Sequence, residues 1–235
     1  MPDDNEVTRF RTHEYKAAFL RHSALVTASS QEAQLGTRLR RSALTAASPQ
    51  AAQIRTLENP DLDHLIVALA TVLKAYVDDT SEKGEACSEL FNEEHHPLDA
   101  SRSWKSVPLY DDVDAFVRQL VVTMQLDDVC LVTALILIER AMRQAGFVLN
   151  ERSWRPGFLV ALLIAMKATY DEDTFLADCQ EAIPGIELHV TNEQEAAFLT
   201  MIGFNTLIRR GQYAKYYYAL QDVVGLYNEM LPPED

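Results

Sequence analysis

The sequence contains only three cysteines, which limits both covalent cross-linking and metal binding. Cys87, Cys130 and Cys179 follow none of the spacings of established zinc sites. A sparse and odd cysteine count is typical of a protein that folds in a reducing compartment. We therefore expect a cytoplasmic or nuclear protein without a bound metal.

Glycine is also scarce, with 8 residues in a chain of 235. The sequence contains no glycine-rich phosphate-binding loop and no nucleophile elbow around a serine. It also lacks a recognisable pair of catalytic carboxylates. These absences argue against an enzyme and against a bound cofactor.

The sequence has no apolar run that is long enough to cross a bilayer. The uninterrupted run from Phe158 to Met166 has nine residues, whereas a membrane-spanning helix needs about 20. The N-terminal stretch MPDDNEVTRF lacks the apolar region of a secretory signal. Pro2 stands where N-myristoylation requires a glycine. We therefore expect no membrane anchor.

Positive charge is in short supply, and the formal net charge is -14. Residues 1–60 carry eight Lys/Arg against six Asp/Glu, so all of the excess negative charge lies in the rest of the chain. An acidic surface repels phosphate backbones, which argues against a nucleic-acid partner. It remains compatible with a protein partner.

Apolar residues recur at helical spacing through most of the chain after residue 60, and only the stretch GIELHV at 185–190 weakly favours a strand. The segment Cys130–Ile138 is apolar nearly all round, as expected of a helix that is surrounded by others. Ser153 is a candidate N-cap, and Thr191 with Gln194 has the spacing of a capping box. The protein is therefore predicted to be all-α, with helices at 62–77, 113–125, 127–146, 153–170, 173–182, 192–203 and 212–231.

The chain divides into three parts by composition. Residues 1–60 are predicted to be weakly ordered or partly helical, because they show little apolar periodicity. Residues 61–108 comprise a helix and an acidic linker, in which 79–108 is polar enough for a loop with at most one helical turn. Residues 109–231 form the main helical domain. The apolar face of the helix at 62–77 is too large to leave in water, so we expect this helix to pack on the body.

Five short motifs in the main domain occur in an order and at separations typical of one family. The pattern resembles a cyclin box, specifically that of the cyclin Y and phosphate-pathway (PHO-type) branch, over about 110 residues. The motifs are TALILIERAM at 133–142, SWRP at 153–156, VALLIAMK at 160–167, EQEAAFLTMIGFN at 193–205 and AKYYYAL at 214–220.

This resemblance implies a single five-helix cyclin box at 109–231, with an additional N-terminal helix and an extended C-terminal helix. Only 15 residues follow residue 220, so we expect no second box. The stretch VDAFVRQLVV does not match the substrate-docking motif of cell-cycle cyclins. The glycine that follows the initiator methionine in the cyclin Y group is also absent.

Three residues match positions through which cyclins contact their kinases. The resemblance implies that Lys167 pairs with Glu195, that both contact the loop before the kinase αC helix, and that Phe204 is an apolar anchor against αC. Position alone leaves other interpretations open. Lys167 also suits the negative end of a helix, and Phe204 could equally pack in the core. Glu139 and Arg140 are interpreted as structural, through an internal ion pair or contacts that hold a loop.

Other polar clusters carry weaker hypotheses. The stretch Glu93-Glu94-His95-His96 and Cys87 fit no zinc pattern, and Asp171-Glu172-Asp173 lacks the rest of a calcium-binding loop and is interpreted as a solvated helix start. Ser42, which follows Arg38-Leu39-Arg40-Arg41, and Ser48, which precedes Pro49, are candidate phosphorylation sites.

The resemblance therefore implies a non-catalytic regulatory subunit that binds and activates a cyclin-dependent-type protein kinase by positioning its αC helix. The alternative is a cyclin-fold interaction or transcription-associated module that binds no kinase. Cyclin-fold transcription factors usually have two boxes and basic DNA-facing surfaces, whereas this chain is acidic.

Overall fold

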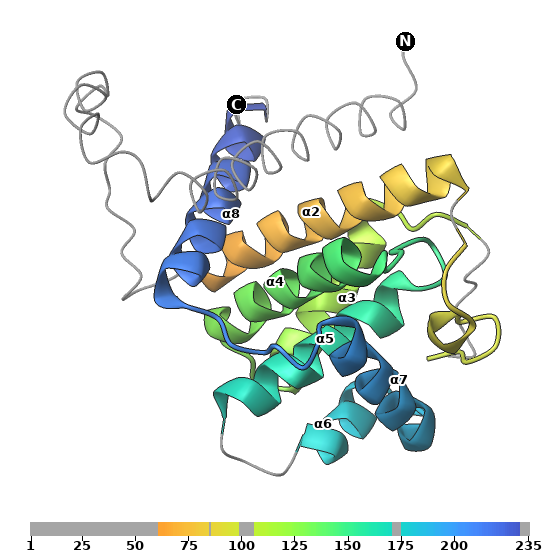
Figure 1. The fold of residues 1–235 in the computed structure, drawn as a ribbon. Helices are drawn as coiled ribbons and strands as arrows, with labels where there is room; N and C mark the ends of the chain where they lie inside the picture. The colour runs from red at the N-terminus through yellow and green to blue at the C-terminus, as the bar shows by residue number, and fades with distance from the viewer. Residues whose placement is uncertain (1–60, 85, 99–105, 171–174, 231–235) are drawn as a thin grey trace, which may run out of the picture.

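The computed structural model describes residues 61–84, 86–98, 106–170 and 175–230, with side chains described except at 175–178 and 224–230. These residues form seven α-helices and one short 3₁₀-helix, and no strand occurs among them, which confirms the all-α prediction (Figure 1). Ser42, Ser48 and the acidic cluster at 171–173 lie outside the described residues. The elements are α2 (Leu62–Lys83), η1 (Glu89–Phe91), α3 (Tyr110–Thr123), α4 (Asp128–Ala145), α5 (Trp154–Thr169), α6 (Phe175–Ala182), α7 (Leu188–Met201) and α8 (Arg210–Met230).

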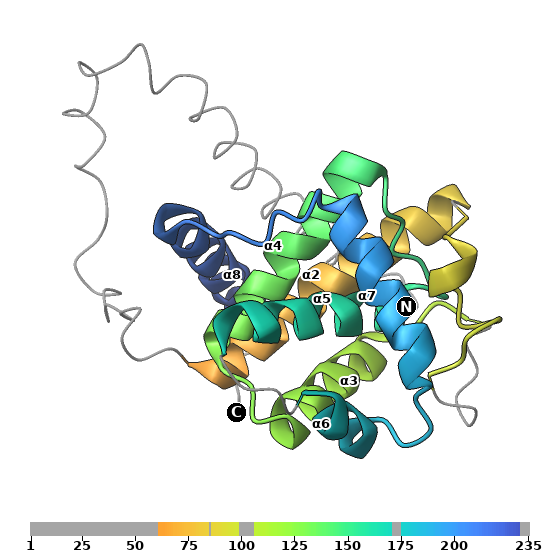
Figure 2. The same ribbon diagram turned by 60° about the horizontal axis from the view of Figure 1, so that its bottom comes forward.

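The helices α4 and α5 form the centre of the molecule. Every residue from Cys130 to Ala141 in α4 and from Trp154 to Met166 in α5 is buried. The helix α5 crosses the middle of the bundle and packs against α4, α6 and α7 (Figure 2). The close approach of a loop to α5 depends on Gly157, because a Cβ there would lie 2.8 Å from Cζ of Phe147. The prediction that Cys130–Ile138 is surrounded by other helices is confirmed.

The helix α2 belongs to the folded body, as predicted, and packs against α3, α4 and α8. It begins at the N-cap Asp61, whose Oδ1 accepts a hydrogen bond from the backbone N–H of His64 at 3.1 Å. It ends at Lys83 instead of residue 77, before Gly84 in the left-handed region at φ 64°. The predicted end was wrong because the last turns carry polar residues that bond locally.

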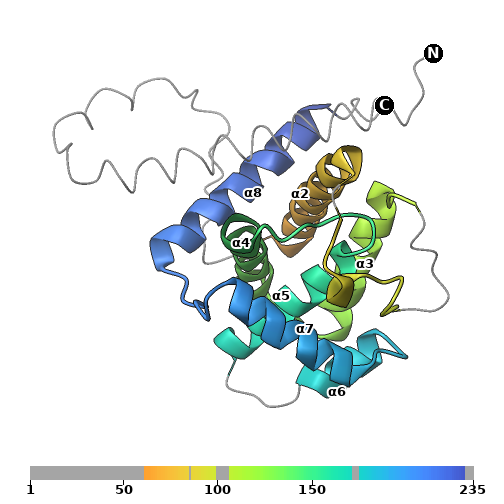
Figure 3. The same cartoon turned by 45° about the vertical axis from the view of Figure 1, so that its right-hand side comes forward.

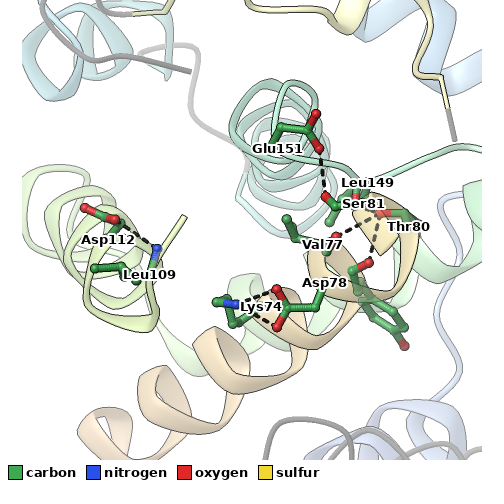
Figure 4. Close-up of polar contacts among 10 residues, drawn as sticks. Lys74, Val77, Asp78, Thr80, Ser81, Leu109, Asp112, Leu149 and Glu151 are labelled. Atoms are coloured by element: carbon green, nitrogen blue, oxygen red, sulfur yellow. Dashed lines mark hydrogen bonds and ion pairs between the residues drawn. The ribbon is translucent and has the colours of Figure 1, made fainter. Parts of the chain in front are cut away.

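Figure 4 shows the polar bonds at the end of α2. Lys74 donates from Nζ to both carboxylate oxygens of Asp78, at 2.5 and 2.6 Å. Thr80 donates to the carbonyl oxygen of Leu149 at 2.5 Å, and Ser81 donates to Glu151 at 2.7 Å. A polar stretch that resembled a linker in sequence is therefore a helix end fastened to the loop before α5.

The described part of the predicted linker packs on the body instead of extending into solvent. The expected helical turn is η1, in which Phe91 is fully buried and lies edge-on to Phe147. The Glu93 carboxylate accepts two hydrogen bonds from the Arg155 guanidinium, the Nε bond at 2.7 Å, and both side chains are buried.

One predicted helix start was wrong, and a second was right in position but differs in its hydrogen bonds. The helix α7 begins at Leu188, so the weak strand signal at 185–190 is not realised. Thr191 lies inside this helix, where its Oγ1 donates to the carbonyl oxygen of Glu187, and Gln194 donates to Leu90. Ser153 does occupy the N-cap position of α5, but its hydroxyl donates to Val148 instead of capping the helix.

The C-terminal helix α8 packs against α2 and α4. Its residues Tyr216, Tyr217, Leu220 and Val223 are buried. The buried Glu139 carboxylate on α4 accepts hydrogen bonds from the hydroxyls of Tyr76 on α2 and Tyr216 on α8, each at 2.7 Å. The two flanking helices are therefore joined to the centre by one carboxylate.

We predict that Leu69→Ala in α2 lowers the free energy of unfolding by about 2–5 kcal/mol, because it opens a cavity at a fully buried position. Urea unfolding followed by circular dichroism measures this loss. Val122→Ala on the exposed face of α3 is the matched control and should change stability by less than about 0.5 kcal/mol. Equal stability of the two variants would show that α2 is not part of the cooperative core.

Candidate protein-docking site

Lys167 and Glu195 form an ion pair between two helices that are far apart in sequence. The Lys167 ammonium at the end of α5 donates to both carboxylate oxygens of Glu195 on α7, at 2.8 and 2.6 Å. The lysine side chain is 39% exposed and the glutamate side chain 14% exposed. The predicted pairing is therefore present, and the pair is open to solvent on its lysine side.

The position of Lys167 follows from where α5 leaves the core. Met166 is still buried, whereas Lys167 and Ala168 are exposed. A lysine at this point can lay its aliphatic stem along apolar surface while its ammonium reaches water. A cation also suits the negative C-terminal end of the helix. Both sequence interpretations of Lys167 are thus compatible with its geometry.

Phe204 is exposed to solvent, and the core-packing interpretation of it was wrong. Its side chain is 69% exposed. It follows Gly203, and both residues have a left-handed backbone: φ is 54° at Phe204 and 59° at Gly203. Its N–H donates to the carbonyl oxygen of Leu199 at 2.8 Å, which closes the end of α7. A bulky residue in the left-handed region is strained, and such strain concentrates at functional positions.

Arg140 holds the chain that follows Phe204. This largely buried side chain of α4 donates to the carbonyl oxygens of Asn205 and of Leu207, the latter at 3.3 Å. Burial lowers the pKa of Arg140, although a guanidinium stays charged. The predicted loop-fixing role is therefore confirmed, and Figure 3 shows the linker between α7 and α8 passing the end of α4.

Sequence reasoning missed Leu207, which is 71% exposed in this linker. Leu207 lies between two predicted helices, where the helical spacing of apolar residues cannot show whether a side chain is exposed or buried. Together, Lys167, Glu195, Phe204 and Leu207 place a charged pair and two apolar side chains on the α5 end, α7 and the following linker. Such a mixture suits recognition of another protein.

The described residues offer little for chemistry. They contain no group of three or more His, Cys, Asp or Glu side chains that could hold a metal ion. Glu93 is buried against Arg155, which leaves it unavailable to a solvent ion. Burial raises the pKa of the Cys130 thiol to about 12, so this cysteine is not a thiolate nucleophile at neutral pH.

Within the described parts of the chain, no helix combines the length and the apolar character needed to cross a membrane.

The described residues form an all-helical domain with a candidate protein-docking site on its surface. A family model described as Cyclin matches residues 63–206, which is more than half of the chain. The chain therefore belongs to the cyclin family, and the match supports a cyclin-type regulator with a protein partner. Cyclins are in general non-catalytic regulatory proteins.

The matched region starts within α2 and ends in the linker after α7. It therefore includes the helix that the sequence analysis placed before a box at 109–231. The division of the chain at residues 60 and 108 stays a prediction.

We predict that Phe204→Gly changes the free energy of unfolding by no more than about 1 kcal/mol. Relief of left-handed strain, about 1–2 kcal/mol, offsets the greater flexibility of glycine in the unfolded chain. Phe198→Ala, at a fully buried position of α7, should instead cost about 3–5 kcal/mol. Denaturant melts of both variants test this contrast, and a large loss for Phe204→Gly would mean that Phe204 supports the fold.

Proposed function

We propose that this cyclin binds a cyclin-dependent-type protein kinase and stabilises the active position of its αC helix. In that position the αC glutamate pairs with the kinase's β3 lysine, which phosphoryl transfer requires. The cyclin acts by binding the active arrangement more tightly than the inactive one. Membership of the cyclin family thus leads to a specific partner, the kinase, and to a specific mechanism, the positioning of its αC helix.

The observation that carries the proposal is the solvent-open pair of Lys167 and Glu195. An ammonium has three donors, and Glu195 takes two contacts from Lys167. A donor of the lysine and lone pairs of the carboxylate remain for a partner. Such a pair can bind both carbonyl and N–H groups of a backbone without regard to its side chains. A loop before αC presents such groups.

The exposed Phe204 supplies the apolar part of the same contact. Aromatic side chains that fill a pocket often dominate the affinity of an interface. The strained backbone at Phe204 is a local cost that the isolated fold does not need, since glycine would suit the position better. We propose that contact with αC offsets this cost.

We further propose that the chain belongs to the cyclin Y and phosphate-pathway branch, on the motifs quoted above, and that it works in the cytoplasm or nucleus. Phosphorylation of Ser42 or Ser48 would place negative charge in the Arg-containing segment and is proposed as a means of regulation. Mass spectrometry of the protein purified from its native cells tests for both modifications.

The direct test of kinase binding mixes the purified chain with each cyclin-dependent-type kinase of the organism. Co-elution on size exclusion and stimulated phosphorylation of a substrate would support the proposal. Absence of binding to every such kinase would favour the alternative, a cyclin-fold module without a kinase. Salt-dependent binding to DNA would favour a transcription-associated version of that alternative.

We predict that Lys167→Ala and Glu195→Ala each weaken kinase binding by about 2–5 kcal/mol, because truncation of one member leaves the other unpaired at an interface that excludes water. Isothermal titration calorimetry measures this loss. Stability of the free protein should fall by less than about 1 kcal/mol, since the pair is partly exposed.

Lys83→Ala is the matched control for these variants. It breaks an exposed lysine–carboxylate pair with Asp79, 2.8 Å long, on α2. This control should leave kinase affinity unchanged. Kinase affinity within about threefold of wild type in Lys167→Ala, together with a large loss of stability, would make the pair an internal bridge and not a docking contact.

A further inference from the structure

The linker between α7 and α8 has an alternating pattern of exposure. Asn205, Leu207 and Arg209 are exposed, whereas Thr206 and Ile208 are half-buried and Ile208 packs against the core. In an extended chain, alternate residues point to the same side. Leu207 and Arg209 therefore share the outward face, at a spacing of roughly 6–7 Å.

Two adjacent arginines stand where this linker meets α8. Arg209 and Arg210 are both exposed, and within the described parts of the chain neither side chain forms an ion pair. Arg210 is the first residue of α8, whose first turn contains no acidic residue. Two cations at the positive end of a helix disfavour folding slightly, and carboxylates would be better there.

The surrounding charge makes these arginines unusual. The chain has a formal net charge of -14. Among the exposed cations of the described residues, Lys83, Arg143 and Lys167 pair with a carboxylate. Arg209 and Arg210 do not, and they are adjacent in the chain. An unpaired cationic pair on such a protein attracts an acidic surface of a partner.

We infer that Phe204, Leu207, Arg209 and Arg210, here called the 204–210 ledge, form the second half of the kinase-docking surface, and that the two arginines bind carboxylates of the kinase. This inference rests on the proposed function. Lys167 and Glu195 contact backbone groups, which do not differ between kinases. The side chains of the 204–210 ledge would instead select among kinases.

The ion pair of Lys167 and Glu195 lies close enough to the 204–210 ledge for one partner to contact both. Glu195 lies six residues before the end of α7 at Met201, which corresponds to roughly 9 Å, and Phe204 follows in the turn that closes the helix. The linker continues for a few more residues to Arg210. A standard interface covers about 800 Å² on each partner, or about 30 Å across, so one kinase can span the ion pair and the ledge.

The composition of the ledge favours an acidic protein surface over other anionic partners. Two exposed apolar side chains lie directly before the arginines, as in an interface with an apolar centre and a charged rim. A phosphate backbone would instead need an extended basic face, which this acidic chain does not offer.

The test compares two charge reversals on α8 that change the net charge equally. Arg210→Glu lies in the ledge, and the control Lys215→Glu is exposed five residues later, about 140° round the helix. We expect Arg210→Glu to lower affinity for the cognate kinase about tenfold, mainly through slower association. The control should change affinity by less than about twofold.

Two further readouts separate binding from a structural role. The affinity difference between Arg210→Glu and wild type should shrink as ionic strength rises, because the contact is between charges. The melting temperature of free Arg210→Glu should rise by about 1–3 °C, because a carboxylate suits the start of α8. Arg210→Lys should retain most of the affinity.

The outcomes distinguish this inference from the proposed function. If no kinase binds the wild-type chain, or if Lys167→Ala binds as well as wild type, the proposed function fails. If Lys167→Ala loses affinity but Arg210→Glu and Lys215→Glu behave alike, only the inference about the ledge fails. If the wild-type chain binds anionic vesicles or DNA and Arg210→Glu loses that binding while its kinase affinity is unchanged, the inference about the ledge fails as well.

Discussion

Burial of α5 on all sides from Trp154 to Met166 is the constraint on which the rest of the structure depends. A helix with apolar residues on every side cannot lie on a surface, so other helices must cover each of its faces. The helices α4, α6 and α7 do so, and the chain just after η1 is held at the N-terminal end of α5 by the bond from Arg155 to Glu93. The first charged residue after the buried run is Lys167, so the same constraint determines where the lysine of the candidate pair reaches the surface.

The buried charged groups maintain the connections between helices. Glu139 accepts hydrogen bonds from tyrosines of α2 and α8, and Arg140 donates to the linker after α7. A buried charge is costly unless it is paired, and each of these has partners from other elements. Two adjacent residues of α4 thus connect the core to both flanking helices and to the candidate interface.

Much of the fold could be predicted from the sequence because α4 and α5 are long, strongly apolar and bounded by clear start and stop signals. The end of α2 and the start of α7 could not, because polar residues that resemble a loop bond within a helix there. The candidate pair of Lys167 and Glu195 came from the family resemblance, since no local pattern joins residues 28 positions apart. Leu207 was missed because exposure in a linker depends on tertiary contacts with α4.

The ion pair and the exposed linker are separate in sequence but share one structural origin. Lys167 is placed by α5, Glu195 by α7, and Phe204 and Leu207 by the bonds from Arg140 of α4. Their relative positions therefore depend on how α4, α5 and α7 pack. Because packed cores do not deform continuously, a core substitution that shifts one helix would misplace part of the proposed docking surface without touching any exposed residue. Such a shift would alter partner binding with only a moderate change in the stability of the free protein.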